Sequence, residues 1–245
     1  MKLSRAFPAP LRLLVFGVLS GAASLHAGIV TVPAGLTVGQ HYRLVFVTLD
    51  TYSPNNSNIN FYNAAVNAEA NGVAALQALN TVWRDIGSTP TVNAIDNIGR
   101  YPGEPIYNLK GDLVAADATT GTNGLWSGGL INPIEWDETG TNGRFMLADT
   151  GTLPDGTGAT DGNEQLGGSG VNVMVGCNIC GAGAWTTAAS GTRAGRLDSL
   201  YAISGELTVE APEPGTVGLT MLGVGFLLAG TRRRYLAQMA TRTNR

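Results

Sequence analysis

The sequence predicts an α+β fold, in which one mixed domain of short antiparallel strands with one or two helices lies between an N-terminal signal peptide and a C-terminal transmembrane helix. Runs of β-branched and aromatic residues occur near both ends of the central stretch, at 42–48 and 200–209. Apolar residues at helical spacing follow the first run, and most of the 34 glycines lie between the two runs, mixed with Thr, Asn and Asp. Such a mixture is typical of short strands that are joined by many turns.

The N-terminal segment, residues 1–27, has the three-part layout of a secretory signal peptide: basic residues up to Arg12, an apolar run from Leu13, and then small residues. The apolar run is about a dozen residues long, whereas a membrane span needs roughly twenty. We therefore expect export through the Sec machinery and cleavage after Ala23 or Ala27. The alternative is a membrane anchor that is never cut.

The central stretch, 28–210, is expected to form one extracytoplasmic domain, because its length suits a single hydrophobic core. From Gly28 to Ala211 it contains one lysine and six arginines against seventeen acidic residues, a formal charge of −10. An acidic surface repels phosphate backbones, so the composition argues against nucleic acid as a partner. It suits a soluble exported protein that meets divalent cations.

The first elements of this domain are a strand and a helix. Residues 42–48 predict a buried strand, and the N-cap candidates at 55–58 precede a helix that ends at Asn71-Gly72. The apolar face of this helix has helical spacing and consists of Ile59, Tyr62, Val66 and Ala70. A second helical turn is expected within 73–79.

After Trp83 the sequence predicts short strands and turns. These segments are 105–115 with a hairpin turn at 110–112, then 125–137, 143–147 and a last strand at 200–209. Because exposed strand edges are normally paired or covered, we expect the first and last strands to pair with each other. Their pairing would close the domain near both of its ends.

The C-terminal tail contains an uncharged stretch at 214–231. As a helix it would reach about 27 Å, which is just enough for a hydrocarbon core of roughly 30 Å. Arg232, Arg233 and Arg234 follow it directly and should remain cytoplasmic by the positive-inside rule. The tail therefore predicts a transmembrane helix that leaves the acidic domain outside the inner membrane.

The order of motifs in the tail resembles the PEP-CTERM sorting signal, here at 211–235: Pro212-Glu213-Pro214, a short apolar helix and an arginine cluster. The resemblance implies recognition by an exosortase, a membrane cysteine transpeptidase that cuts near the Pro-Glu-Pro and releases or transfers the body. Similar tails occur on proteins exported alongside extracellular polysaccharide and on some ice-binding proteins. A plain C-terminal anchor is the alternative interpretation.

The body, over about 40–209, is similar to secreted bacterial domains that are distantly akin to the C-type lectin-like fold. The matching segments, in order, are 44–48, 62–64, 83–89, 93–97, 105–115, 125–134, 137–140, 157–162 and 184–186. This resemblance implies a lectin-like fold and a surface that recognises carbohydrate. The chain has a single cysteine pair, whereas such domains usually have two or more disulfides.

Cys177 and Cys180 form a C-x-x-C pair in a protein that is expected to be exported to an oxidising compartment. A redox site of the thioredoxin type needs the first cysteine at a helix N-terminus. Here Gly176 precedes the pair and Gly181 follows it, so the sequence offers no helix. We predict a local disulfide that staples a glycine-rich loop.

A calcium site is one interpretation of Asp155, Asp161 and Glu164, which place oxygen donors on a glycine-rich loop. Their spacing is not that of an EF-hand or of a calcium-binding nonapeptide repeat. An ordinary solvated loop is the alternative, because turns favour Asp, Asn and Gly in any case. No other cofactor is predicted.

Enzymatic chemistry has few candidates. Glu135, Asp137 and Glu138 lie beside Trp136 and could serve a glycosidase, but carboxylates this close in sequence more often belong to a solvated strand end. His41 is the one histidine after the signal peptide, and nothing marks it for catalysis.

Three tryptophans are candidates for a sugar-stacking platform. The alternative interpretation is that at least two of them pack in the core. The residues concerned are Trp126, Trp136 and Trp185. The sequence therefore predicts a non-enzymatic, exosortase-processed protein of the cell surface or extracellular matrix, with a carbohydrate-recognising surface. A carboxylate-dependent enzyme acting on exported polysaccharide and an inert matrix protein are the alternatives.

Overall fold

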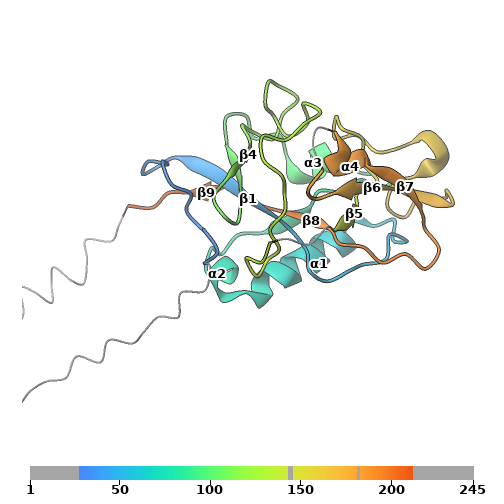
Figure 1. The fold of residues 1–245 in the computed structure, drawn as a ribbon, viewed down its shortest axis with the longest axis horizontal. Helices are drawn as coiled ribbons and strands as arrows, with labels where there is room; N and C mark the ends of the chain where they lie inside the picture. Colours follow the sequence, from blue (N-terminus) through green and yellow to red (C-terminus); the bar gives the residue numbers. More distant parts are fainter. Residues whose placement is uncertain (1–27, 143–145, 181–182, 212–245) are drawn as a thin grey trace, which may run out of the picture.

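The computed structural model describes residues 28–142, 146–180 and 183–211. The predicted signal peptide (1–27) and the sorting tail from Pro212 onward lie outside the described residues. The described chain forms a mixed α+β domain with two sheets (Figure 1). Among the described residues, no helix is both long and apolar enough to cross a membrane, and the predicted span at 214–231 lies outside them.

The larger sheet is built around β1 (His41–Val47). Its strand order is β2 (Trp83–Asp85), β8 (Tyr201–Ser204), β1, β3 (Ile106–Asn108) and β4 (Leu113–Ala115). β3 is parallel to β1, so the sheet has mixed strand orientation and the expectation of antiparallel strands is wrong for this pair. β8 is antiparallel to β1, and β9 (Leu207–Thr208) pairs with its first residues. The predicted pairing of the first and last strands is therefore confirmed. Both ends of the described chain consequently lie on the same side of the domain (Figure 1).

Alternate side chains of β1 belong to two different hydrophobic cores, as the two-residue period of a strand requires. Leu44 and Phe46 face one core, whereas Val45 and Val47 face the other. All four are fully buried. A sheet covered on both faces explains why this segment is almost continuously apolar rather than alternating in polarity.

The first core is covered by α1 (Ile59–Gly72). This helix ends at the predicted stop, Asn71-Gly72. The Oδ1 atom of Asn58 accepts a hydrogen bond from the backbone N–H of Asn60 at 3.0 Å and so caps the helix. The four residues predicted for the apolar face are its buried residues. α2 (Ala74–Gln77) supplies the expected second turn, and α1 packs beside β2 (Trp83–Asp85).

The second core is covered mainly by irregular chain on the opposite face of the sheet (Figure 1). It includes α3 (Ala94–Ile98), the hairpin of β3 with β4 (Leu113–Ala115), and the tryptophan of α4 (Ala184–Thr187). The predicted hairpin at 105–115 is thus confirmed. Aromatic rings pack against one another in this core at tilted angles, with 5.5 Å between the ring centroids of Trp126 and Trp185 and 5.9 Å between those of Trp185 and Tyr201.

The strand expected at 125–137 is wrong, because this segment forms turns with isolated bridges at Trp136 and Asp137. A side chain takes the place of strand-to-strand backbone pairing here, because the Nδ2 atom of Asn132 donates a hydrogen bond to the carbonyl of Leu113 at 2.8 Å. A strand exists near the one expected at 143–147, but β5 runs from Leu147 to Asp149, and 143–145 lie outside the described residues.

The smaller sheet was not predicted. Its order is β5-β6-β7, where β6 (Asn172–Cys177) lies between β5 and β7 (Ala189–Thr192). All of its pairings are antiparallel. A 3-10 turn, η1 (Asp161–Asn163), precedes β6.

Candidate functional site

The three residues predicted to bind calcium have different roles in the structure. Asp155 closes a turn, because its Oδ1 atom accepts hydrogen bonds from the backbone N–H and the hydroxyl of Thr157 at 3.0 and 2.6 Å. These bonds lower the pKa of Asp155. Glu164 accepts a hydrogen bond from the hydroxyl of Ser190, and Asp161 begins η1. No cluster of three or more acidic, His or Cys side chains suited to a metal ion occurs within the described residues, so these three are not brought together.

The acidic cluster at 135–138 also serves the fold. The Oδ1 atom of Asp137 accepts three hydrogen bonds, from the N–H and hydroxyl of Thr139 and from the N–H of Thr141. Glu138 accepts from the N–H of Leu49 at 3.0 Å, and burial raises the pKa of its carboxyl to about 7. Both carboxyl groups are almost fully buried. They fix a turn and a neighbouring loop, and they do not open toward a substrate.

The tryptophans do not form an exposed platform. Trp126 and Trp185 are buried in the second core, as core packing predicts. Trp136 is partly buried, and the Nζ atom of Lys110 lies 5.0 Å from the centroid of its ring. This cation–π contact occupies one face of the ring.

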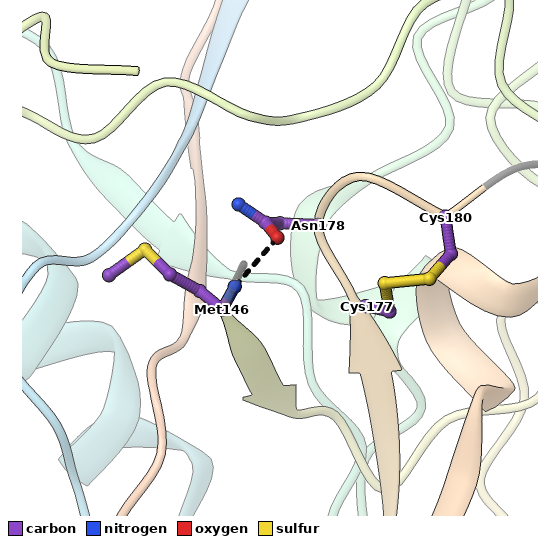
Figure 2. The surroundings of a disulfide bond; sticks show 4 residues. All are labelled: Met146, Cys177, Asn178 and Cys180. Carbon is purple, nitrogen blue, oxygen red and sulfur yellow. Dashed lines mark hydrogen bonds between the residues drawn. A yellow bond between two sulfur atoms is a disulfide. The ribbon is translucent and has the colours of Figure 1, made fainter. Parts of the chain in front are cut away.

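The two cysteines are joined in a disulfide at the end of β6 (Figure 2). Cys177 is the last residue of that strand and is not at a helix N-terminus, the position that thiol activation of the thioredoxin type requires. Asn178 lies between the cysteines and continues the pairing of β6 with β5: its Oδ1 atom accepts from the N–H of Met146 at 2.9 Å, and its own N–H donates to the carbonyl of Met146 at 3.2 Å. The disulfide therefore fixes the turn beyond this ladder.

His41 lies at the exposed start of β1. Its Nδ1 atom is 3.2 Å from Glu206 Oε1 and 3.1 Å from the hydroxyl of Thr208. About half of its side chain is exposed, and its neighbours belong to the β9 edge.

A pair of buried carboxyl groups is a feature that the sequence did not predict. Asp85 of β2 is fully buried, and neither of its carboxyl oxygens has a hydrogen-bond partner among the described residues. Burial, and then the charge of Asp149, raise its pKa well above the usual value. Asp149 of β5 accepts a hydrogen bond from Nε of Arg196 at 2.8 Å, yet burial raises its pKa to about 7. In the structure, Trp83 and Asp85 of β2 are both buried and Arg84 between them is exposed, so the carboxyl group occupies a core-facing position of the strand.

The sequence also gave no sign of the buried guanidinium of Arg193. This side chain donates hydrogen bonds to backbone carbonyls from three separate segments. The accepting residues are Pro54, Asn163, Gln165, Gly170 and Asn172. A planar group with five N–H donors can bind several carbonyls at once, so Arg193 ties the loop after β1 to the loop before β6.

An open depression of about 470 Å³ lies above the first of these loops. Its lining is uncharged and consists of Ser53, Asn55, Asn56, Ser57 and Phe61. Phe61 is on the first turn of α1 and is 44% exposed, whereas the neighbouring Tyr62 is fully buried. Neutral hydrogen-bonding side chains and an exposed aromatic ring therefore come together around this depression.

Comparison with known proteins adds no further identification: no family model matches the chain, and no curated protein matches it.

Proposed function

We propose that this chain is an exported, exosortase-processed protein of the cell surface or extracellular matrix, without enzymatic activity and with a carbohydrate-recognising surface. The observation that carries the proposal is the order of the tail, Pro212-Glu213-Pro214, the uncharged stretch 214–231 and Arg232 to Arg234. In this proposal the Sec machinery exports the chain, and the tail holds it briefly in the inner membrane with the body facing the periplasm. The exosortase then cuts near the Pro-Glu-Pro.

The junction between the body and the tail supports processing. β9 ends at Thr208, and Val209 then makes two backbone hydrogen bonds with the residues before β1. The N–H of Val209 donates to the carbonyl of Gln40 at 3.0 Å, and the carbonyl of Val209 accepts from the N–H of Gly39 at 2.9 Å. A cut near Ala211 therefore removes no described element. The prolines at 212 and 214 keep the junction out of regular helix, so a protease could reach its backbone.

The choice of a binding protein over an enzyme rests on the acidic residues. The carboxyl groups of Asp137 and Glu138 are buried and already hydrogen-bonded to the backbone, which argues against a role in hydrolysis. The mixed α+β fold, with much of one sheet face covered by turns, is compatible with a C-type lectin-like body. We therefore propose that the body binds extracellular polysaccharide and does not cleave it.

The sorting part of the proposal is tested by expressing the full chain in a host with an active exosortase and in the same host after deletion of that enzyme. Mass spectrometry of the exported protein should show an N-terminus between Ser24 and Gly28 and a C-terminus near Ala211. The deletion host should instead retain a longer, membrane-bound form.

A variant with alanine at Pro212 and Pro214 is the matched test of the motif, and a variant with the remote exposed substitution Val171→Ala is its control. The first should accumulate in membranes, whereas the second should be processed normally. Recovery of the intact C-terminal peptide from membranes of the exosortase-active host would show that the tail is a plain anchor.

A further inference from the structure

We propose that the depression lined by Ser53, Asn55, Asn56, Ser57 and Phe61, called here the Asn-Phe site, binds a neutral saccharide. The proposal deepens the carbohydrate-recognising part of the proposed function and rests on it. It names the place of recognition and the chemical class of the ligand. Neither the predicted calcium loop nor the tryptophans contribute to this site.

The backbone beneath the Asn-Phe site is held from below by buried groups. The carbonyl of Pro54 accepts hydrogen bonds from the N–H of Gly167 at 2.7 Å and from Nη1 of Arg193 at 2.6 Å. The hydroxyl of Tyr62 accepts from the N–H of Asn56 at 3.0 Å and donates to the carbonyl of Ser53 at 3.3 Å. The loop is therefore ordered before any ligand arrives, which reduces the entropy lost on binding.

Gly167 shows how closely this support fits. Its φ is +66°, and a Cβ atom there would lie 2.2 Å from the backbone nitrogen of Ser57 and 2.3 Å from the backbone of Asn56. Only glycine allows the two loops to approach this closely. The fold fixes the backbone of this loop, whereas the side chains of Asn55 and Ser57 are exposed and those of Ser53 and Asn56 are partly exposed.

Those side chains offer both donors and acceptors. Asn55 uses its Nδ2 atom to donate to the hydroxyl of Ser53 at 2.8 Å, and Asn56 uses its Oδ1 atom to accept from the N–H of Asn58 at 2.9 Å. Within the described residues, no other hydrogen bond engages the amide oxygen of Asn55 or the amide nitrogen of Asn56. An acceptor and a donor held on a rigid loop match the paired hydroxyl groups of a sugar ring.

Phe61 supplies the apolar part of the site. Its ring packs edge-on against the buried ring of Tyr62, with 5.2 Å between the centroids and 88° between the planes. This contact orients the Phe61 ring while 44% of the residue stays exposed. An aromatic face beside neutral polar groups suits the apolar C–H face of a saccharide, which also has hydroxyl groups around its rim.

Charge decides the class of saccharide. No acidic or basic side chain of the described chain lines the site, so nothing in its lining would balance a carboxylate or sulfate group. The body as a whole has a formal charge of −10, which repels anionic polymers at low ionic strength. The Asn-Phe site therefore favours neutral hexose units over uronates.

The test uses the mature exported protein on a glycan array that contains neutral hexose oligosaccharides, uronate-containing oligosaccharides and unglycosylated peptides. Titration calorimetry then follows with the strongest neutral oligosaccharide. Wild-type protein is expected to bind the neutral class, and Phe61→Ala should weaken that binding by about tenfold or more, which corresponds to about 1.4 kcal/mol.

Three further variants make the result specific. Phe61→Tyr keeps the aromatic ring and should retain binding. Asn56→Ala removes the amide donor and should weaken binding. Val171→Ala alters an exposed apolar residue outside the Asn-Phe site and should leave binding unchanged. Thermal melts of each variant separate loss of binding from loss of fold. The Phe61 position is exposed, so its substitution should leave the melting temperature nearly unchanged.

Binding that Phe61→Ala does not weaken would overturn the assignment of the site, although carbohydrate recognition would stand. Preference for uronates or peptides, or no binding at all, would overturn the proposed ligand class. Exosortase processing is read from the C-terminus of the same protein preparations. Failure of the Asn-Phe site can therefore be told apart from failure of the sorting proposal.

Discussion

Replacing Asp149 by asparagine is expected to stabilise the domain above neutral pH and to leave its stability in acid almost unchanged. The carboxyl group of Asp149 is buried on β5, and burial raises its pKa from the usual 3.8 to about 7 despite the hydrogen bond from Arg196. Between these two pH values the folded state keeps a proton that the unfolded state releases. Stability must therefore fall as the pH rises through this window.

The size of the effect follows from the two pKa values. A difference of about three pH units corresponds to about 4 kcal/mol of unfolding free energy, lost progressively between about pH 4 and pH 7 and fully lost above it. The asparagine side chain of the variant would be neutral at every pH and could still accept the hydrogen bond from Arg196. The substitution would also remove the negative charge that raises the pKa of Asp85, so the gain in stability includes a contribution from that neighbour.

Urea denaturation of wild type and Asp149→Asn at about pH 4 and about pH 8 measures this difference. Asp155→Asn is the control with the opposite sign, because hydrogen bonds from Thr157 lower the pKa of Asp155 and its charge stabilises the fold at neutral pH. That variant should lose stability at the higher pH. If Asp149→Asn is destabilised equally at both pH values, the buried carboxyl is charged and paired in the folded protein, and the reasoning is wrong.

Three further substitutions test the supports of the loops. Gly167→Ala should lower the unfolding free energy in urea by more than about 3 kcal/mol, because its Cβ atom would clash with backbone. Gly39 is also at positive φ but has open space around it, so Gly39→Ala should cost only about 1 kcal/mol. Equal losses would show that the clash at Gly167 is unimportant. Arg193→Lys should lower the unfolding free energy by roughly 3 kcal/mol, because a lysine cannot bind carbonyls from several segments at once, and an unchanged melting temperature would contradict this role. Loss of the disulfide in Cys180→Ser should cost only about 2 kcal/mol in the same assay, because the loop that it closes with Cys177 is very short. A much larger loss would contradict this loop-length argument.

The elements that the sequence predicted well have strong local signals. The bounds of α1 were predicted correctly, because its N-cap at Asn58, its apolar spacing and its stop lie within one short segment of the sequence. β1 and the β3–β4 hairpin were found from β-branched runs and from turn residues at 110–112. The pairing of β1 with β8 followed from two apolar runs that each need a partner.

The elements that were missed depend on contacts between distant segments. β7 consists of Ala-Ser-Gly-Thr, which has no apolar pattern, and it is a strand only because β6 lies beside it. Asp85 and Asp149 come from different sheets, so no local sequence window brings them together. The segment 125–137 has strand-forming residues, yet Leu125, Trp126 and Ile134 lie in the second core while turns satisfy much of the backbone.

Three aspartates of this chain close turns in the same way. Asp117, Asp137 and Asp155 each accept hydrogen bonds from the N–H and the hydroxyl of the threonine two residues later, at 2.9–3.0 Å and 2.6 Å. A domain with so many glycines loses much conformational entropy on folding, and these turns fix its loops with side chains in place of regular structure. Carboxylates used in this way are poor candidates for metal binding or hydrolysis. The loop at 53–57 is also fixed by its own turn, because Asn56 accepts from the N–H of Asn58, but Arg193, Gly167 and Tyr62 hold its backbone from beneath as well. Its turn is therefore built with neutral amide side chains, and Asn55 and Ser57 stay exposed.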